Sequence, residues 1–214
     1  MPLFFQHQLS NATQLAIWKI EEPELFFAAQ VPLQNSITHP HKRLQHLAGR
    51  YLLQHLAADF PYHEMLIATT RKPFLPNEQY HFSISHCANY AAAIVSNSER
   101  VGIDIELPTP RVLKIASKFL HSSEQEWVAL QHHSEVLLTT LLWNAKEAIY
   151  KWWGRGEVDF AAMIIIEPFV LQTSGSMVAR FIKEEACVEL QLQYHCFQEV
   201  CATWVKTDVL HLFT

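Results

Sequence analysis

The sequence predicts an α+β protein built from two similar halves, and three features of the chain support this prediction. Half of its 214 residues are hydrophobic and only 17% are charged, which is enough apolar material for one large core or two small ones. Each half runs from helix-like segments to strand-like segments in the same order. Pro108-Thr109-Pro110 interrupts the chain between them without a low-complexity linker. We therefore expect an N-terminal α+β half, residues 1–107, and a C-terminal α+β half, residues 108–214.

The first half contains one helix with a clear buried stripe. Over residues 41–58, apolar side chains recur at the i, i+3, i+4, i+7 spacing of an amphipathic helix. Residues 15–17 indicate an earlier short strand, and Pro23 is suited to open a helix that runs to residue 29. Strand-like segments follow at residues 65–69, 81–84, 90–95 and 101–106. We expect the last two to form a hairpin, because residues 96–100 have the composition of a turn.

The second half is predicted to contain the longest helix, over residues 136–153, with one strongly apolar face. Thr109 can cap a helix that begins at Pro110, and Ser123 with Glu126 has the capping-box pattern of another. Strands are expected at residues 163–171, 177–182, 187–194 and 200–206. In the third of these, apolar and polar residues alternate, which predicts an antiparallel strand with one solvent face.

Charge and missing motifs exclude several classes of protein. A net charge of −5 argues against a general nucleic-acid binder. No apolar run approaches the roughly 18 residues that cross a bilayer, so no membrane association is expected. The chain has neither GxxxxGK[ST] nor GxGxxG, so a phosphate site would be built from side chains and a metal. The first residues lack a signal-peptide pattern and the four cysteines form no CxxC pair, which predicts a cytoplasmic protein with reduced thiols.

Three carboxylates are candidates for a metal site. Asp104 and Glu106 are two residues apart in an expected strand, so they share a face, and their like charges favour a nearby cation. Glu147 lies one turn before Lys151 on the expected long helix. The alternatives are an acidic solvent-exposed strand face and a surface Glu147–Lys151 ion pair. If the three carboxylates gather without histidine or thiolate, they favour Mg²⁺ over zinc.

Basic residues are concentrated in the first half of this acidic chain. Arg43 and Arg50 are on one side of the helix expected over residues 41–58. Lys72 precedes Pro73, which stiffens the loop. His86 closes the segment Phe82-Ser83-Ile84-Ser85-His86. A solvated basic helix face and a partly buried histidine are the structural alternatives to a binding site for a polyanion.

In order along the chain, these segments resemble the 4′-phosphopantetheinyl transferase superfamily, in its larger Sfp-type branch. The family pattern is a KP loop, then F-N-x-S-H, G-[IV]-D-[IV]-E and W-x-x-K-E-[AS]-x-x-K. It is matched here by Lys72-Pro73 and by residues 82–86, 102–106 and 143–151. Leu47-Ala48-Gly49-Arg50 also matches a family helix whose arginine reaches coenzyme A. Two positions depart from the pattern: Ser83 replaces the usual asparagine, and Arg71 stands where glycine commonly precedes Lys-Pro.

The resemblance implies an enzyme that transfers 4′-phosphopantetheine from coenzyme A to a serine hydroxyl of an apo acyl or peptidyl carrier protein and releases 3′,5′-ADP. It also implies halves related by a pseudo-twofold axis, an active site in the crevice between them, and a monomer. By family position, Asp104, Glu106 and Glu147 would hold Mg²⁺. The catalytic residues would be Glu147, Lys151 and His86. The coenzyme A ligands would be Arg43, Arg50, Lys72, Pro73, Ser85, His86 and Lys151. Carriers of fatty-acid, polyketide and non-ribosomal peptide synthesis are all compatible.

Two other functions remain open at this point. Another Mg²⁺-dependent hydrolase or transferase acting on a nucleotide pyrophosphate would use the same carboxylates without a carrier protein. A non-catalytic coenzyme A-binding relative is the second, although it would have no physical reason to keep Asp104, Glu106 and Glu147 together.

Overall fold

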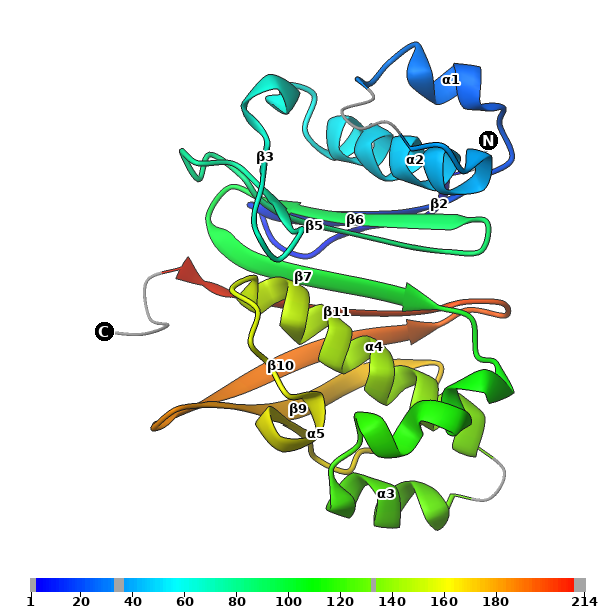
Figure 1. Ribbon diagram of the computed structural model, residues 1–214, viewed down its shortest axis with the longest axis vertical. Coiled ribbons are helices and arrows are strands. Elements are labelled where there is room, and N and C mark those ends of the chain that lie inside the picture. The colour runs from blue at the N-terminus through cyan, green and yellow to red at the C-terminus, as the bar shows by residue number, and fades with distance from the viewer. Residues whose placement is uncertain (1–2, 33–36, 132–133, 210–214) are drawn as a thin grey trace. The chain divides into compact units, whose positions relative to one another are not determined.

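The computed structural model describes residues 3–32, 37–131 and 134–209. The chain divides into two compact units, Met1–Val101 and Gly102–Thr214. In each unit, a long helix packs on an antiparallel sheet (Figure 1). The division falls six residues before the expected one. The reason is that the strand Glu99–Glu106 (β7) pairs with a strand of the second unit, so Asp104 and Glu106 belong to that unit.

The first unit contains a four-stranded antiparallel sheet in the order β1-β2-β6-β5. Its elements are β1 (Leu3–Gln8), β2 (Thr13–Lys19), α1 (Glu24–Ala28), α2 (Pro40–Leu56), the 3₁₀ turn η1 (Tyr62–Glu64), β3 (Leu66–Ile67), β4 (Pro73–Phe74), β5 (His81–Cys87) and β6 (Tyr90–Ser96). The predicted stripe of α2 packs on β6, every residue of which is buried. Burial of that stripe confirms the amphipathic helix.

The second unit contains a five-stranded sheet in the order β7-β11-β10-β9-β8. Its other elements are the 3₁₀ helix η2 (Pro110–Lys118), α3 (Ser122–Ala129), α4 (Glu135–Trp153), α5 (Phe160–Met163), β8 (Ile164–Ile166), β9 (Ser174–Lys183), β10 (Ala186–Cys196) and β11 (Cys201–Asp208). Helix α4 packs along β11 (Figure 1). The polar residues of β10 alternate with buried Leu190, Leu192 and Tyr194, which confirms the predicted solvent face.

Two local predictions are wrong. The segments 90–95 and 101–106 do not form a hairpin, because β6 pairs with β2 and β5 whereas β7 pairs with β11. A turn composition permits a hairpin but does not choose the partner strand. The capping box of α3 uses His121 and Glu124 rather than Ser123 and Glu126. Glu124 is held in place because its carboxylate also pairs with Lys146 and accepts a hydrogen bond from the backbone nitrogen of Ile166.

The expected cap at Thr109 is absent, since its side chain makes no cap hydrogen bond, and the segment that follows winds as 3₁₀ turns rather than an α-helix. In the described part of the chain, no helix has the length and apolar character needed to span a membrane.

Candidate active site

The acidic part of the site depends on the close approach of β7 to α4, which Gly102 permits. A Cβ atom added at Gly102 would lie 2.1 Å from the carbonyl oxygen of Ala148 and 2.8 Å from the backbone nitrogen of Trp152. Only a residue without a side chain fits against the helix backbone at that separation. Gly102 therefore brings the strand residues that follow it alongside the helix turn that carries Glu147.

At this contact, the structure brings Asp104, Glu106, Glu147 and Lys151 together. The Nζ atom of Lys151 donates a hydrogen bond to Oδ1 of Asp104 at 2.6 Å, and the Asp104 side chain is 6% exposed. The sequence left open a surface ion pair between Glu147 and Lys151, whereas the described partner of Lys151 is Asp104 on the strand. The lysine is thus the cation expected beside adjacent carboxylates.

The other two carboxyl groups of the cluster, those of Glu106 and Glu147, both have raised pKa values. Burial, followed by the charge of Asp104, raises the pKa of Glu147 to about 7, although Lys151 acts to lower it. Burial and the charge of Asp104 also raise the pKa of Glu106 to about 7, while Lys151 and a hydrogen bond with Trp143 act to lower it. These carboxyls affect one another electrostatically, so an added cation would stabilise their ionised forms.

The donor chemistry of this cluster fits a hard divalent cation. All three candidate ligands are carboxylates, and carboxylate oxygens are the protein ligands that Mg²⁺ prefers. As the side chains stand, no group of three His, Cys, Asp or Glu within residues 3–32, 37–131 and 134–209 is spaced to hold a metal ion. A cation bound by all three carboxylates would therefore require their side chains to turn toward it and Lys151 to give up part of its contact with Asp104.

The first lysine of the helix motif, Lys146, has a structural role. Its Nζ lies 2.7 Å from Glu124 and donates to the carbonyl oxygens of Phe160, at 2.9 Å, and Ile164, at 2.5 Å. Glu124 also accepts from the backbone nitrogens of His121, at 2.7 Å, and Ile166, at 2.8 Å. Both charged side chains are almost completely inaccessible, so this network is fully enclosed. It ties α3, α5 and β8 to α4 and holds the helix that carries Glu147.

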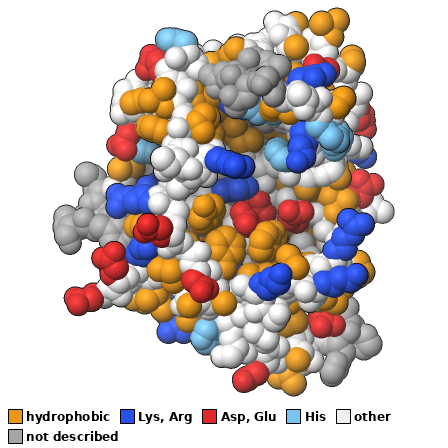
Figure 2. Space-filling view, in the orientation of Figure 1, with side chains coloured by type: hydrophobic (Ala, Val, Ile, Leu, Met, Phe, Trp, Pro, Cys, Tyr) orange, Lys and Arg blue, Asp and Glu red, His pale blue; other side chains and the backbone are white. Residues whose placement is uncertain are grey.

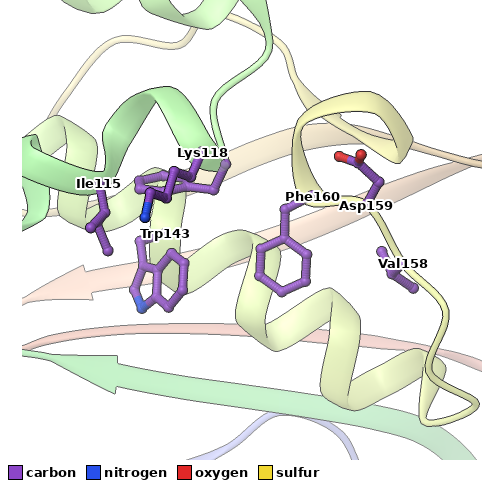
Figure 3. A pocket seen from close by; sticks show the side chains of 7 residues that line it. Ile115, Lys118, Trp143, Val158, Asp159 and Phe160 are labelled. Carbon is purple, nitrogen blue, oxygen red and sulfur yellow. The ribbon is translucent and has the colours of Figure 1, made fainter.

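A pocket of about 400 Å³ lies beside the same helix (Figure 3). Its lining residues come from η2, α4 and the segment leading into α5: Ile115, Lys118, Phe119, Trp143, Val158, Asp159 and Phe160. Trp143 forms one wall, with its ring centroid 4.9 Å from that of Phe119 and 5.8 Å from that of Phe160. Because Trp143 also hydrogen-bonds with Glu106, the pocket wall adjoins the carboxylates. Figure 2 shows apolar side chains exposed among charged ones on the face in view.

The first unit holds a buried arginine on α2. Gly49 permits the approach of this helix to β5, since a Cβ there would lie 2.6 Å from the Cγ2 atom of Ile84. Arg50 is only 4% exposed, and its Nη1 donates to Nδ1 of His46 at 2.9 Å. Burial lowers the pKa of Arg50 to about 10, so it remains a cation at neutral pH. A buried cation at this position favours an anionic ligand.

His46 of α2 contacts Arg50 and is affected by the charge of His86 on β5. Burial, then the charges of Arg50 and His86, lowers the pKa of His46 to about 4. His46 is therefore neutral at pH 7 and accepts the arginine's hydrogen bond at Nδ1, which places its proton on Nε2. That Nε2 atom is buried and has no hydrogen-bond partner in the described structure. His46 was not among the candidate site residues predicted from the sequence, although its spacing of four residues from Arg50 places the two on one face of the helix.

A second basic group surrounds Lys72. Burial and the charge of Arg100 lower the pKa of Lys72 to about 8. Burial, with the charges of Arg100 and Lys72, also lowers the pKa of His81, against the raising effect of Glu78. Arg71, just before Lys72, has a φ of 66°, the left-handed conformation that favours glycine. Arg71 thus adopts a backbone conformation that glycine would adopt without steric cost.

The other candidate residues have varied surroundings. Arg43 pairs with Glu24 at 2.7 Å and donates to the carbonyl oxygen of Ile37 at 3.2 Å, so it is already engaged within the first unit. Ser85 is buried on β5, His86 is exposed on the same strand, and Pro73 begins β4. Sequence reasoning missed Arg100 and His81, because only the fold brings them to Lys72.

Two family models match this chain, one in each unit. The model described as the 4′-phosphopantetheinyl transferase N-terminal domain matches residues 32–96. The model described as the 4′-phosphopantetheinyl transferase superfamily matches residues 100–205. The chain belongs to the 4′-phosphopantetheinyl transferase superfamily.

Individual relatives are similar over half of the chain. Enterobactin synthase component D of Salmonella typhi is 32% identical over 113 residues, which is 51% of this chain and 47% of the relative. The 4′-phosphopantetheinyl transferase gsp of Aneurinibacillus migulanus is 34% identical over 113 residues, 51% of this chain and 46% of the relative. The 4′-phosphopantetheinyl transferase AcpT of Escherichia coli O157:H7 is 31% identical over 114 residues, which is 51% of this chain and 57% of the relative. The chain spans about half the length of the curated relatives it matches.

Proposed function

We propose that this protein transfers 4′-phosphopantetheine from coenzyme A to a serine hydroxyl of an apo acyl or peptidyl carrier protein and releases 3′,5′-ADP. The observation that carries the proposal is the gathering of Asp104, Glu106 and Glu147 around Lys151 in a member of this superfamily. The names of the similar proteins, two transferases and an enterobactin synthase component, support the same reaction.

Asp104, Glu106 and Glu147 are the residues that would hold Mg²⁺ against the pyrophosphate of coenzyme A. Bound there, the ion would offset negative charge on the pyrophosphate as the leaving group departs. Burial and the charge of Asp104 raise the pKa values of Glu106 and Glu147, so a bound cation would stabilise their ionised forms, which supports this assignment.

Lys151 and Glu147 are the proposed catalytic side chains of the second unit. In the transfer, the serine oxygen forms a bond to the phosphorus that carries pantetheine, and the bond from that phosphorus to the leaving 3′,5′-ADP breaks. Glu147 accepts the serine proton, directly or through a water molecule, and the negative charge of its ionised carboxylate suits this role. The ammonium of Lys151 offsets charge on the phosphate oxygens.

The first unit's basic residues are proposed to hold the nucleotide end and phosphates of coenzyme A. Arg50 supplies charge from a buried position and Lys72 from a half-buried one, and Ser85 and His86 supply hydrogen bonds from one strand. Pro73 would hold the loop that presents Lys72. Arg43 would join them by exchanging its ion pair with Glu24 for a phosphate.

Several further expectations remain predictions of this proposal. They are the pseudo-twofold relation of the halves, an active-site crevice between them, a monomer, and a cytoplasmic location. Fatty-acid, polyketide and non-ribosomal peptide carriers are the candidate acceptors.

Incubation of the purified protein with coenzyme A, Mg²⁺ and a panel of apo carrier proteins tests the function. We expect at least one carrier to gain the mass of a single phosphopantetheine arm on its serine, with an equal amount of 3′,5′-ADP. Release of nucleotide without carrier modification would support a pyrophosphate hydrolase instead. Coenzyme A binding with neither product would support a non-catalytic relative. A carrier whose acceptor serine is replaced by alanine serves as the control.

A further inference from the structure

Two cysteines face each other at the end of the β10–β11 hairpin. Cys196 is the last residue of β10, Cys201 is the first of β11, and they are direct partners in the register. The backbone nitrogen of Cys196 donates to the carbonyl oxygen of Thr173 at 2.7 Å. Thr173 lies on the β9 side of β10, so this N–H points away from β11. In the next pair along the hairpin, the backbone nitrogen of Phe197 donates to the carbonyl oxygen of Val200 at 2.9 Å. Hydrogen-bonded and non-hydrogen-bonded pairs alternate along antiparallel strands. Because Phe197 and Val200 are hydrogen-bonded, the adjacent pair of Cys196 and Cys201 is a non-hydrogen-bonded pair.

This type of pair brings two side chains as close as a sheet allows. Its Cα atoms are about 4.5 Å apart, which lies inside the range of about 4.4–6.8 Å that disulfides span. The Cys201 thiol already hydrogen-bonds with the sulfur of Cys196. A disulfide between them would therefore need no change of register and no displacement of either strand.

The two thiols also differ in a way that suits stepwise oxidation. Cys196 is half-buried, whereas Cys201 is completely buried in the core of the second unit. The hydrogen bond with Cys201 lowers the pKa of the Cys196 thiol, while burial acts to raise it. Cys187 is exposed on β10 opposite Ile182, and Cys87 belongs to the first unit, so neither faces another cysteine in its own sheet.

We propose that Cys196 and Cys201 are an oxidisable dithiol that a peroxide converts into a cross-strand disulfide. The Cys196 thiolate attacks one peroxide oxygen, the O–O bond breaks, and a sulfenic acid and hydroxide are formed. The sulfur of Cys201 then displaces the hydroxyl of the sulfenic acid, its thiol proton leaves with that hydroxyl as water, and the S–S bond forms. Two thiols and one hydrogen peroxide thus become one disulfide and two water molecules.

The disulfide would lie next to a support of the catalytic helix. The backbone carbonyl of Cys201 accepts a hydrogen bond from the buried side chain of Asn144 at 3.0 Å. Asn144 is on α4, one turn before Glu147. A cross-link at Cys201 would therefore resist opening of the hairpin end against which this helix packs. The proposal stands independently of the reaction proposed above.

Treatment of the full chain with hydrogen peroxide tests the proposal in a Cys187→Ser background, which removes the exposed thiol as a source of intermolecular links. No lysine or arginine lies between Lys183 and Lys206, so trypsin releases residues 184–206 as one peptide containing both cysteines. We expect this peptide to lose two hydrogens, to resist alkylation at both sulfurs, and to regain both properties after dithiothreitol.

A matched variant and a defined contrary result complete the test. Cys196→Ser in the same background removes a half-buried sulfur at the hairpin end, and its circular dichroism spectrum verifies folding. After peroxide treatment, the tryptic peptide of this variant should not lose two hydrogens. If Cys196 instead gains oxygen while Cys201 stays open to alkylation, or if both cysteines stay reduced at peroxide levels that oxidise free cysteine, the proposal is wrong.

Discussion

The substitution Gly102→Ala, which adds one methyl group to β7, should disrupt the contact between β7 and α4. The new Cβ would lie 2.1 Å from the Ala148 carbonyl oxygen and 2.9 Å from the Cβ of Trp152. Ordinary van der Waals contact begins near 3.4 Å, so the strand and the helix must separate by about 1 Å. Because most of the opposing atoms are backbone, we expect a cost near the upper end for overpacking, about 3 kcal/mol. For a chain of this size, that corresponds to a fall in Tm of about 10 °C.

The same displacement should separate the carboxylates. Asp104 is two residues after Gly102, and Glu147 immediately precedes Ala148 on the helix. A misplacement of about 1 Å in a catalytic constellation can cost about 100-fold in rate, and we expect a comparable loss of kcat for carrier modification. Differential scanning calorimetry and the carrier mass assay measure the two effects.

Gly175→Ala provides the matched control, since it alters another strand glycine of the same unit. The three atoms nearest its added Cβ would all belong to the side chain of Tyr194, at 3.0–3.2 Å, and we expect a change in stability within about 1 kcal/mol. If Gly102→Ala kept both the Tm and the transfer rate of the unmodified protein, the assembly of the site by this contact would be refuted.

Four further predictions concern individual residues. Glu147→Gln should lower kcat at least 100-fold with an unchanged circular dichroism spectrum, and full turnover would remove Glu147 from the mechanism. Arg50→Ala should raise the KM for coenzyme A about 10-fold or more and affect kcat less, because a remote phosphate contact is mostly uniform binding; the reverse pattern in steady-state kinetics would contradict that role. Burial and Arg100 hold the pKa of Lys72 near 8, so its ammonium is lost as pH rises from 7 to 9 and the Kd for coenzyme A should rise several-fold. In Lys72→Arg, calorimetric titration should find this pH dependence much reduced, and an unchanged dependence would point to another group. Arg71→Gly should raise stability by about 0.5–1 kcal/mol, because glycine adopts a φ of 66° without steric cost, and a fall in Tm would show that the arginine side chain contributes more than its backbone conformation costs.

Periodicity within a single element was enough to predict the main helices and one strand. The apolar stripe over residues 41–58 and the apolar face over residues 136–153 each lie on one continuous helix, so spacing alone reveals them. The alternation in β10 is equally local. The strand β1 was not predicted, since only two of its six residues are half-buried and its pattern is weak.

Partner choice between distant segments could not be predicted in the same way. The motif at residues 102–106 was correctly seen as a strand, but its pairing with β11 depends on a segment about one hundred residues later. For the same reason, Lys151 was considered with Glu147 on its own helix, whereas packing brings it to Asp104. The capping box at His121 also depends on tertiary structure, because Glu124 is fixed by Lys146 and Ile166.

We propose that Asp104, Glu106 and Glu147 bind one divalent cation together. Anomalous diffraction from crystals grown with Mn²⁺ and coenzyme A would locate this cation, since Mn²⁺ accepts the oxygen ligands of Mg²⁺ and scatters anomalously. We predict one strong peak within coordination distance of oxygens from all three carboxylates and of the coenzyme A pyrophosphate. A peak at other residues, or no peak under conditions in which the protein modifies a carrier, would rule out this shared site.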